Sequence, residues 1–275
     1  MATNYASYGA SSLDDLANLD TRQIYDATRL DPMLNPHGVI RECCDSEEHP
    51  NTFPIILALD VTGSMGKAAS MCAAKLNDIM TELYGKIQDV EFMMMGIGDL
   101  AYDNAPIQAT QFESDVRILD QTTKIWFEAG GGGNSYESYT AAWYFGLHNT
   151  KLDCWKRGKR GLIITLGDEP LNPYLPGRKL SEVLGSPTQD VDTKELYKQV
   201  QDKFSVYHIA IHDSECSFGY YAEDIRKTWG KLLGQHCLYA KSEDLPAVIG
   251  QIVDDHLAGN GPLTTATETQ EGISW

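Results

Sequence analysis

Three oxygen-bearing side chains stand at alternating positions directly after a short apolar run. Asp60 ends the run 54–60, Thr62 and Ser64 follow it, and Gly63 between them allows a tight turn from a strand into a helix. Oxygen atoms spaced in this way can converge on one point at such a turn. Carboxylate and hydroxyl oxygens are hard ligands, suited to Mg²⁺ or Ca²⁺ and poorly suited to zinc or copper. The motif therefore predicts part of a divalent-metal site.

Further oxygen donors follow other apolar runs and a run of glycines. Asp168 comes just after the run 162–166, and Asp99 comes just after the run 90–97. Asn134 and Glu137 follow four consecutive glycines, whose backbone could approach a ligand closely. Ligands of a doubly wound sheet bind beyond the carboxyl ends of its strands, so we expect these side chains to meet there. Mg²⁺ usually keeps some of its water, which would leave a position for a carboxylate from a partner.

The pattern Asp60-x-Thr62-x-Ser64 resembles the DxSxS signature of von Willebrand factor A domains, with threonine in place of the first serine. The surrounding stretch LALDVTGSMG is similar to the first strand and helix of that family. Asn134-x-x-Glu137 is similar to the A-like domains of integrin β subunits, where a glutamate binds the metal directly. The lead-in RECCDSEEHP also resembles uncharacterised bacterial and phage A-domain proteins.

This resemblance implies a metal-ion-dependent adhesion site with defined roles. By it, Glu137 would be a direct ligand beside the 60–64 motif, and Asn134 would serve a neighbouring ion. Asp168 would reach the ion through water, and Asp99 would lie in the layer behind the ligands. The family usually has T-D-G around its last aspartate, whereas this chain has G-D-E-P, which alters the local turn.

Other readings of these residues are weaker. Asp60, Thr62 and Ser64 could cap a helix, because all three residue types favour that position. A P-loop would need a glycine where Val61 stands and a hydroxyl after Lys67, and neither is present. His208 and His212 are four residues apart at the end of an apolar run and are expected to be structural.

Apolar runs alternate with helical patterns and predict an α/β fold, a doubly wound, mainly parallel sheet of about six strands with one antiparallel edge strand. Its strands are expected at 54–60, 90–97, 107–112, 162–166, 206–211 and 236–240. Helices are expected at 65–84, 115–127, 138–147, 192–203, 219–233 and 243–257. We assign 52–258 to this domain, 1–51 to an N-terminal arm and 259–275 to a C-terminal tail. The connection 170–191 is unusually long, so we expect it to shape partner choice together with the N-terminal arm, and we expect deletion of 172–189 to leave folding intact and to abolish partner capture.

Charge and cysteine usage narrow the function. Acidic residues outnumber basic ones by 39 to 22, giving a net charge of −17, which disfavours nucleic acid as a partner. The six cysteines show no zinc spacing, and no apolar run is long enough for a membrane helix. A cytoplasmic protein without a membrane partner is the expectation.

These observations predict a binding protein and not an enzyme. Its cofactor would be Mg²⁺, or Mn²⁺ or Ca²⁺, and its partner a protein that presents an Asp or Glu. Family analogy suggests an AAA⁺ ATPase as partner, and self-assembly is also open. The alternatives are a structural subunit of a homo-oligomeric or phage-like assembly with a stabilising metal, and a metal-dependent hydrolase, for which the sequence offers no separate general base.

Overall fold

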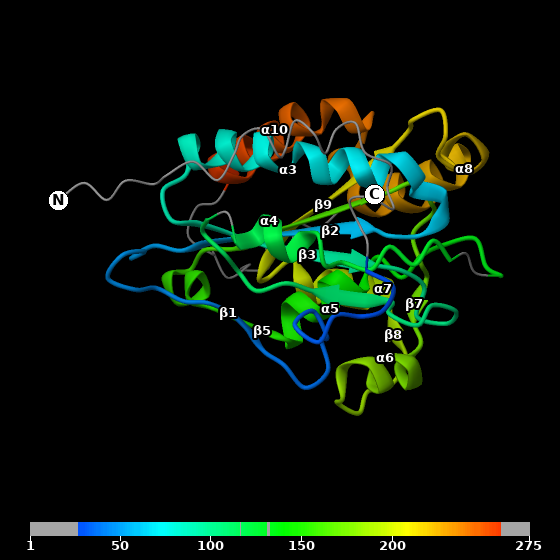
Figure 1. Ribbon diagram of the computed structural model, residues 1–275, viewed down its shortest axis with the longest axis horizontal. Coiled ribbons are helices and arrows are strands. Elements are labelled where there is room, and N and C mark those ends of the chain that lie inside the picture. Colours follow the sequence, from blue (N-terminus) through cyan, green and yellow to red (C-terminus); the bar gives the residue numbers. More distant parts are fainter. Residues whose placement is uncertain (1–26, 116, 131–132, 260–275) are drawn as a thin grey trace, which may run out of the picture.

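The computed structural model describes residues 27–115, 117–130 and 133–259. Its centre is a six-stranded sheet in the order β10-β9-β6-β2-β3-β4, in which every neighbouring pair is parallel except β3 and β4. Strands β9, β2 and β3 of this sheet are labelled in Figure 1. The predicted doubly wound fold with one antiparallel edge strand is therefore confirmed. The strands are β2 Phe53–Asp60, β3 Val90–Ile97, β4 Ile107–Ala109, β6 Gly161–Gly167, β9 Phe204–Ile211 and β10 Cys237–Ala240.

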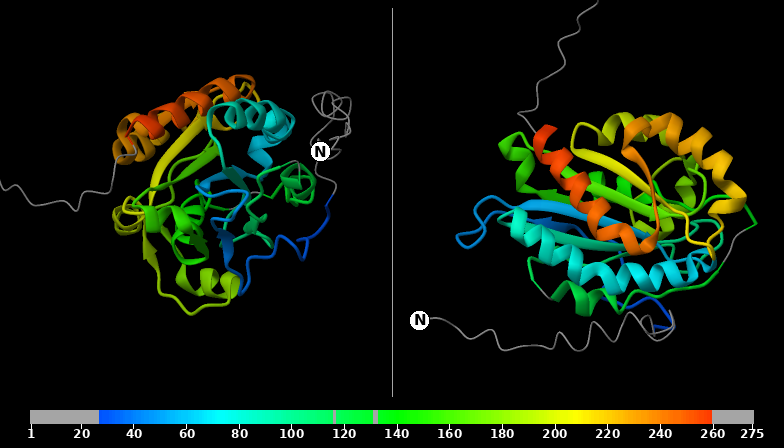
Figure 2. Two further views of the ribbon diagram at one scale, coloured as in Figure 1. Left: turned by 90° about the vertical axis from the view of Figure 1, so that its left-hand side faces the viewer. Right: turned by 90° about the horizontal axis from the view of Figure 1, so that it is seen from above.

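Helices cover both faces of the sheet, which is why its central strands are apolar on both sides. On one face, Ile55, Leu57 and Leu59 of β2 pack with α3 Gly66–Lys86 and α10 Leu245–Gly259. These two helices lie side by side over the sheet (Figure 2). The other face is covered by α5 Ala141–His148, α7 Thr193–Val200 and α8 Phe218–Ile225, which continues through a π-helical turn, Arg226–Gly230, into α9 Lys231–Leu233.

Two predicted elements are half as long as the sequence suggested, or shorter. Strand β4 ends at Ala109, where the Thr110 hydroxyl accepts from the Met94 N–H at 2.9 Å while the Thr110 N–H still donates to the Met94 carbonyl at 3.0 Å. The helix expected at 115–127 is only α4 Arg117–Thr122. Its last hydroxyl, on Thr122, donates to the Ile118 carbonyl at 2.7 Å, and the chain then turns to bury Ile125.

The described part of the predicted N-terminal arm packs on the domain. Strand β1 Arg41–Cys43 pairs in parallel with β5 Thr150–Leu152, and Leu34 is fully buried in the core. The carbonyl of Leu34 also accepts from the Ala109 N–H at 3.0 Å, which ties the segment to β4. The remainder of the predicted arm, 1–26, and the predicted tail from 260 onward lie outside the described residues.

The connection 170–191 contains regular structure that was not predicted from the sequence. It forms β7 Tyr174–Leu175, α6 Gly177–Leu184 and, at its end, β8 Val191–Asp192, which pairs with β7. Leu175, Leu180 and Leu184 are buried in the core on the α5 side of the sheet. Their removal would open that core, so the expectation that this segment is dispensable for folding is wrong.

The remaining regular elements are short 3₁₀ turns at Gly63–Met65, Asp153–Arg157, Gly234–His236 and Ser242–Asp244. Among the helices that the structure describes, none combines the length and apolar character required to cross a bilayer. All six cysteines are free thiols.

Candidate metal-binding site

Asp60, Thr62 and Ser64 form one hydrogen-bonded group where β2 ends. Asp60 is fully buried, and one of its carboxylate oxygens accepts from both the Thr62 N–H (2.9 Å) and the Thr62 hydroxyl (2.5 Å). The hydroxyl oxygens of Thr62 and Ser64 lie 3.3 Å apart. The segment 129–130 packs closely against this turn: the Gly63 N–H donates to the Gly130 carbonyl at 2.9 Å, and a Cβ on Gly63 would lie 3.2 Å from the carbonyl oxygens of Ala129 and Gly130. The converging oxygens predicted from the spacing are therefore present.

Helix capping does not account for this group. Thr62 stands at the N-cap of the 3₁₀ turn Gly63–Met65, yet its side chain accepts no hydrogen bond from that turn. Helix α3 begins after Met65 and likewise has no side-chain cap. The hydroxyls of Thr62 and Ser64 are directed to each other and to carboxylates, so the capping interpretation fails.

Asp168 joins the group from the end of β6. Ser64 donates its hydroxyl hydrogen to one Asp168 oxygen at 2.9 Å, and the Ser217 N–H donates to the other at 2.6 Å. Asp168 is fully buried, and β2 and β6 are adjacent parallel strands, so their carboxyl ends coincide. Residues 104 positions apart in the sequence thus meet at one edge of the sheet.

Tyr139 is part of the site and was not foreseen from the sequence. Its hydroxyl donates to the second oxygen of Asp60 at 2.6 Å, and its ring is fully buried. The ring occupies the space that a side chain on Gly167 would need, since a Cβ there would overlap the tyrosine hydroxyl. No motif marks this residue, although a glycine at the end of an otherwise bulky strand indicates that something packs closely against it.

Glu137 is buried beside the group, with one carboxylate oxygen that has no hydrogen-bond partner among the described residues. Its backbone is fixed by a bridge to Leu171, just after the β6 end. Burial, reinforced by the nearby charges of Asp60 and Glu169, raises the pKa of Glu137 to about 11. The charged groups that influence this buried carboxyl are all acidic, so it has no cation to stabilise its ionised form.

Asp99 and Asn134 form a separate pair. The Asn134 side-chain amide donates to Asp99 at 2.5 Å, and the other Asp99 oxygen accepts from the Ala101 N–H at 2.7 Å. No hydrogen bond between described residues joins this pair to Asp60, Ser64 or Asp168. Asp99 is close enough to influence Glu137 electrostatically, so it borders the site.

The carboxylates raise one another's pKa values. Burial and the neighbouring Asp168 raise the pKa of Asp60 to about 7. Burial also raises the pKa of Asp168, and burial with the charge of Asp60 raises that of Glu169 to about 8. Like Tyr139, Glu169 belongs to the site and was not predicted from the sequence. Such a concentration of acids is costly to ionise unless a cation neutralises it.

These residues fit a hard divalent cation only if the hydroxyls are counted. In the described part of the chain, no three His, Cys, Asp or Glu side chains are grouped closely enough to hold a metal ion by themselves. The Thr62 and Ser64 hydroxyls, however, are brought together by Asp60 and Asp168, and Glu137 contributes an unsatisfied oxygen. Oxygen donors of this kind are those that Mg²⁺ and Ca²⁺ prefer.

Comparison with known proteins supports the fold. No protein-family model matches the chain, and no curated protein matches it by sequence. Among solved structures, the pilus adhesin SpaC from Lactobacillus rhamnosus GG in its open conformation is similar over 82% of this chain and 31% of its own, with 13% identity and a TM-score of 0.53. A second form of that adhesin gives a TM-score of 0.51 at 13% identity, over 82% of this chain and 32% of its own.

The conserved hypothetical protein BatB from Bacteroides thetaiotaomicron is similar over 75% of this chain and 99% of its own, at 13% identity and a TM-score of 0.43. This chain spans about a third of the adhesin's length. At these identities the likeness concerns the fold. The architecture is a doubly wound α/β fold.

Proposed function

We propose that this protein is a metal-dependent protein-binding module that uses a divalent cation, Mg²⁺ by preference, to accept a carboxylate from a partner. The observation that carries the proposal is the link between two strand ends: Asp60 holds the Thr62 hydroxyl, and Asp168 holds the Ser64 hydroxyl. The two hydroxyl oxygens lie 3.3 Å apart, and the buried Glu137 has an oxygen without a protein partner.

Within this proposal the residues have different tasks. Thr62, Ser64 and Glu137 would supply oxygen ligands, while Asp60 and Asp168 orient the hydroxyls and add negative charge. Tyr139 fixes the carboxylate plane of Asp60 through its hydroxyl. A bound Mg²⁺ supplies a positive charge with an exchangeable position where a partner Asp or Glu can bind.

Binding is preferred to catalysis because the residues around the site are engaged in holding one another. His208, whose ring lies 5.5 Å from that of Tyr139, is fully buried and hydrogen-bonded to the Thr165 hydroxyl at 2.9 Å. Burial lowers the pKa of His208 to about 3, so it stays neutral and has no contact with solvent through which to relay protons. The cytoplasm as location, and an AAA⁺ ATPase or a second copy as partner, remain predictions.

Metal binding is tested by titrating Mg²⁺, Mn²⁺ and Ca²⁺ into the metal-free protein in a calorimeter. Ser64→Ala removes a proposed ligand and Asp168→Asn removes the acceptor that orients it, so each should weaken binding by tenfold or more, roughly 1.4 kcal/mol. Ser114→Ala is the matched control, because its hydroxyl contacts His49 and none of the site residues. Equal binding by Ser64→Ala and wild type would refute the metal site.

Partner binding is tested by affinity capture with the wild-type protein in Mg²⁺, with and without EDTA. Ser64→Ala should retain no more than EDTA-treated protein does, and the Ser114→Ala control should capture as wild type. Size-exclusion mass in Mg²⁺ and in EDTA distinguishes a second copy from a different partner. Capture that persists in EDTA and with Ser64→Ala would leave the fold as a binding scaffold without metal dependence.

A further inference from the structure

Strand β9 has a free edge along its first half. Strand β10 pairs only with the later part of β9, from His208 opposite Cys237 to Ile211 opposite Ala240. On that side, 204–207 have no strand partner among the described residues, while on the other side they pair with β6 from Gly161 onward. A free strand edge presents backbone N–H and C=O groups that another extended segment can pair with.

The direction of these backbone groups follows from bonds elsewhere on the same strand. The Lys203 carbonyl accepts from the Gly161 N–H, so the backbone groups of this odd-numbered residue face β6. The N–H of the even-numbered His212 donates to the Ala240 carbonyl and so faces β10. Backbone groups of successive residues in a strand point to opposite sides, so the N–H and C=O of Phe204 and Val206 face the free edge. The Tyr207 carbonyl agrees, since it accepts from the Thr165 hydroxyl in β6.

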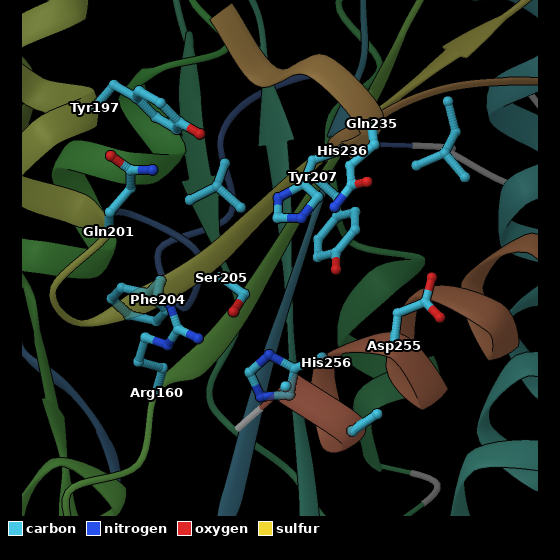
Figure 3. A pocket seen from close by; sticks show the side chains of 14 residues that line it. Arg160, Tyr197, Gln201, Phe204, Ser205, Tyr207, Gln235, His236, Asp255 and His256 are labelled. Carbon is cyan, nitrogen blue, oxygen red and sulfur yellow. The ribbon is translucent and has the colours of Figure 1, made fainter. Parts of the chain in front are cut away.

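A groove of about 480 Å³ lies along this edge, between α7 and α10 (Figure 3). Its wall includes Phe204 to Tyr207 of β9, and the ring of Tyr207 stacks on that of His236 with 4.2 Å between centroids. The groove lies where β6 and β9 begin, at the opposite end of the strands from Asp60 and Asp168. It is therefore separate from the candidate metal site.

The end of α10 lies in the same groove. Ala258 and Gly259, its last residues, line the groove beside Asp255 and His256. The sequence continues with Asn260-Gly261-Pro262, residue types that reverse a chain, and then with Leu-Thr-Thr-Ala-Thr at 263–267. Threonine is favoured in strands, and a strand of four residues covers about 13 Å, the length of the free edge 204–207.

We propose that residues 263–267 of this same chain occupy the groove as an added strand paired with the free edge of β9. A reversal within Asn260-Gly261-Pro262 would bring the segment to the groove directly after the end of α10, and so short a connection would cost little closure entropy. Backbone pairing would supply most of the stabilisation, as in other cases where an extended segment joins a sheet edge. This inference does not depend on the metal site or its function.

Amide hydrogen exchange, resolved by NMR, tests the pairing in the full chain against a chain that stops at Gly259. The Val206 N–H faces the added strand and should exchange roughly tenfold faster or more in the shortened chain. The Tyr207 N–H faces β6 and should be unchanged, which makes it an internal control. Cross-strand nuclear Overhauser contacts between Val206 and 263–267 are expected in the full chain only.

Two proline variants of the full chain separate pairing from tail length. Thr265→Pro removes a backbone donor inside the proposed strand and should accelerate exchange at Val206 as truncation does. Gln270→Pro lies beyond the strand and should leave it protected. Equal Val206 exchange in the full and shortened chains, or equal effects of the two prolines, would overturn the proposal. Protection that rises with protein concentration would also overturn it, because a second copy would then be the occupant.

Discussion

Replacing Glu137 by Gln should make the metal-free protein more stable and at the same time remove its response to metal. Glutamine keeps the size of the side chain but cannot ionise. In the wild type, burial among acids raises the pKa of Glu137 from an ordinary 4.5 to about 11, so folding at neutral pH requires the carboxyl to take up a proton. The substitution removes that requirement.

The magnitude follows from linkage. Because the folded pKa lies above the unfolded one, the carboxyl is harmless below pH 4.5 and costs stability as the pH rises above that value. At pH 7 the cost is about 3 kcal/mol at most, from 1.36 kcal/mol for each pH unit above 4.5. Glu137→Gln should therefore melt up to about 6 to 12 °C higher at pH 7, and level with wild type near pH 4.5.

Metal should have the opposite effect on the two proteins. A cation present at a hundredfold excess over its dissociation constant stabilises the folded protein by about 2.7 kcal/mol. This corresponds to a rise of about 5 to 10 °C for the wild type, and we expect no rise for Glu137→Gln, whose neutral amide replaces the proposed carboxylate ligand. Melting curves in EDTA and in saturating Mg²⁺ measure both effects.

Glu113→Gln is the matched control for the same chemical change. Glu113 is also buried, but its carboxylate accepts from Gln121 at 2.7 Å and pairs with Arg117 at 2.9 Å. Its substitution should lower the melting temperature and preserve the metal-induced rise. A metal-free Glu137→Gln protein that is less stable than wild type at pH 7, or one with the full metal response, would refute the reasoning.

Two further predictions concern neighbouring residues. Tyr139→Phe removes the 2.6 Å hydrogen bond to the buried Asp60, so it should lower the free energy of unfolding, measured by chemical denaturation, by about 1.5 to 3 kcal/mol. It should also weaken Mg²⁺ binding in calorimetry. Unchanged values for both would show that the bond is not needed. Burial lowers the pKa of His208 to about 3, below its unfolded value of about 6.5, so folding stability should fall as the pH drops below 6.5, by up to 1.36 kcal/mol for each pH unit from this residue. Denaturation midpoints of wild type and His208→Gln between pH 7 and pH 4 measure this, and parallel curves would contradict it.

The strands of the sheet were predictable because each is buried on both faces. An apolar run such as 54–60 or 90–97 is too short for a typical buried helix, and its continuous apolar character suits a strand that is covered on both faces. The 60–64 motif was predictable for a related reason: its three oxygens are neighbours in the chain, so one local turn brings them together. Both features are determined within a few residues.

Features that depend on distant neighbours were not predictable in the same way. Helix α6 was missed because its Leu180 and Leu184 read as part of a polar connection until the core beside α5 is known. The helix at 115–127 was expected to be long because its sequence permits it, but packing of Ile125 ends it early.

The sequence by itself determined the sheet, the order of its strands along the chain and the metal-type motif at the end of β2. Only the tertiary structure decided that Tyr139 would hold Asp60, that Asp168 would take the Ser64 hydroxyl, and that Glu137 would be buried with an oxygen unsatisfied. The physical reason is the separation in sequence between the residues that interact. Local patterning records which face of an element is apolar, whereas the burial and pairing of a polar atom depend on which remote segments the fold brings against it.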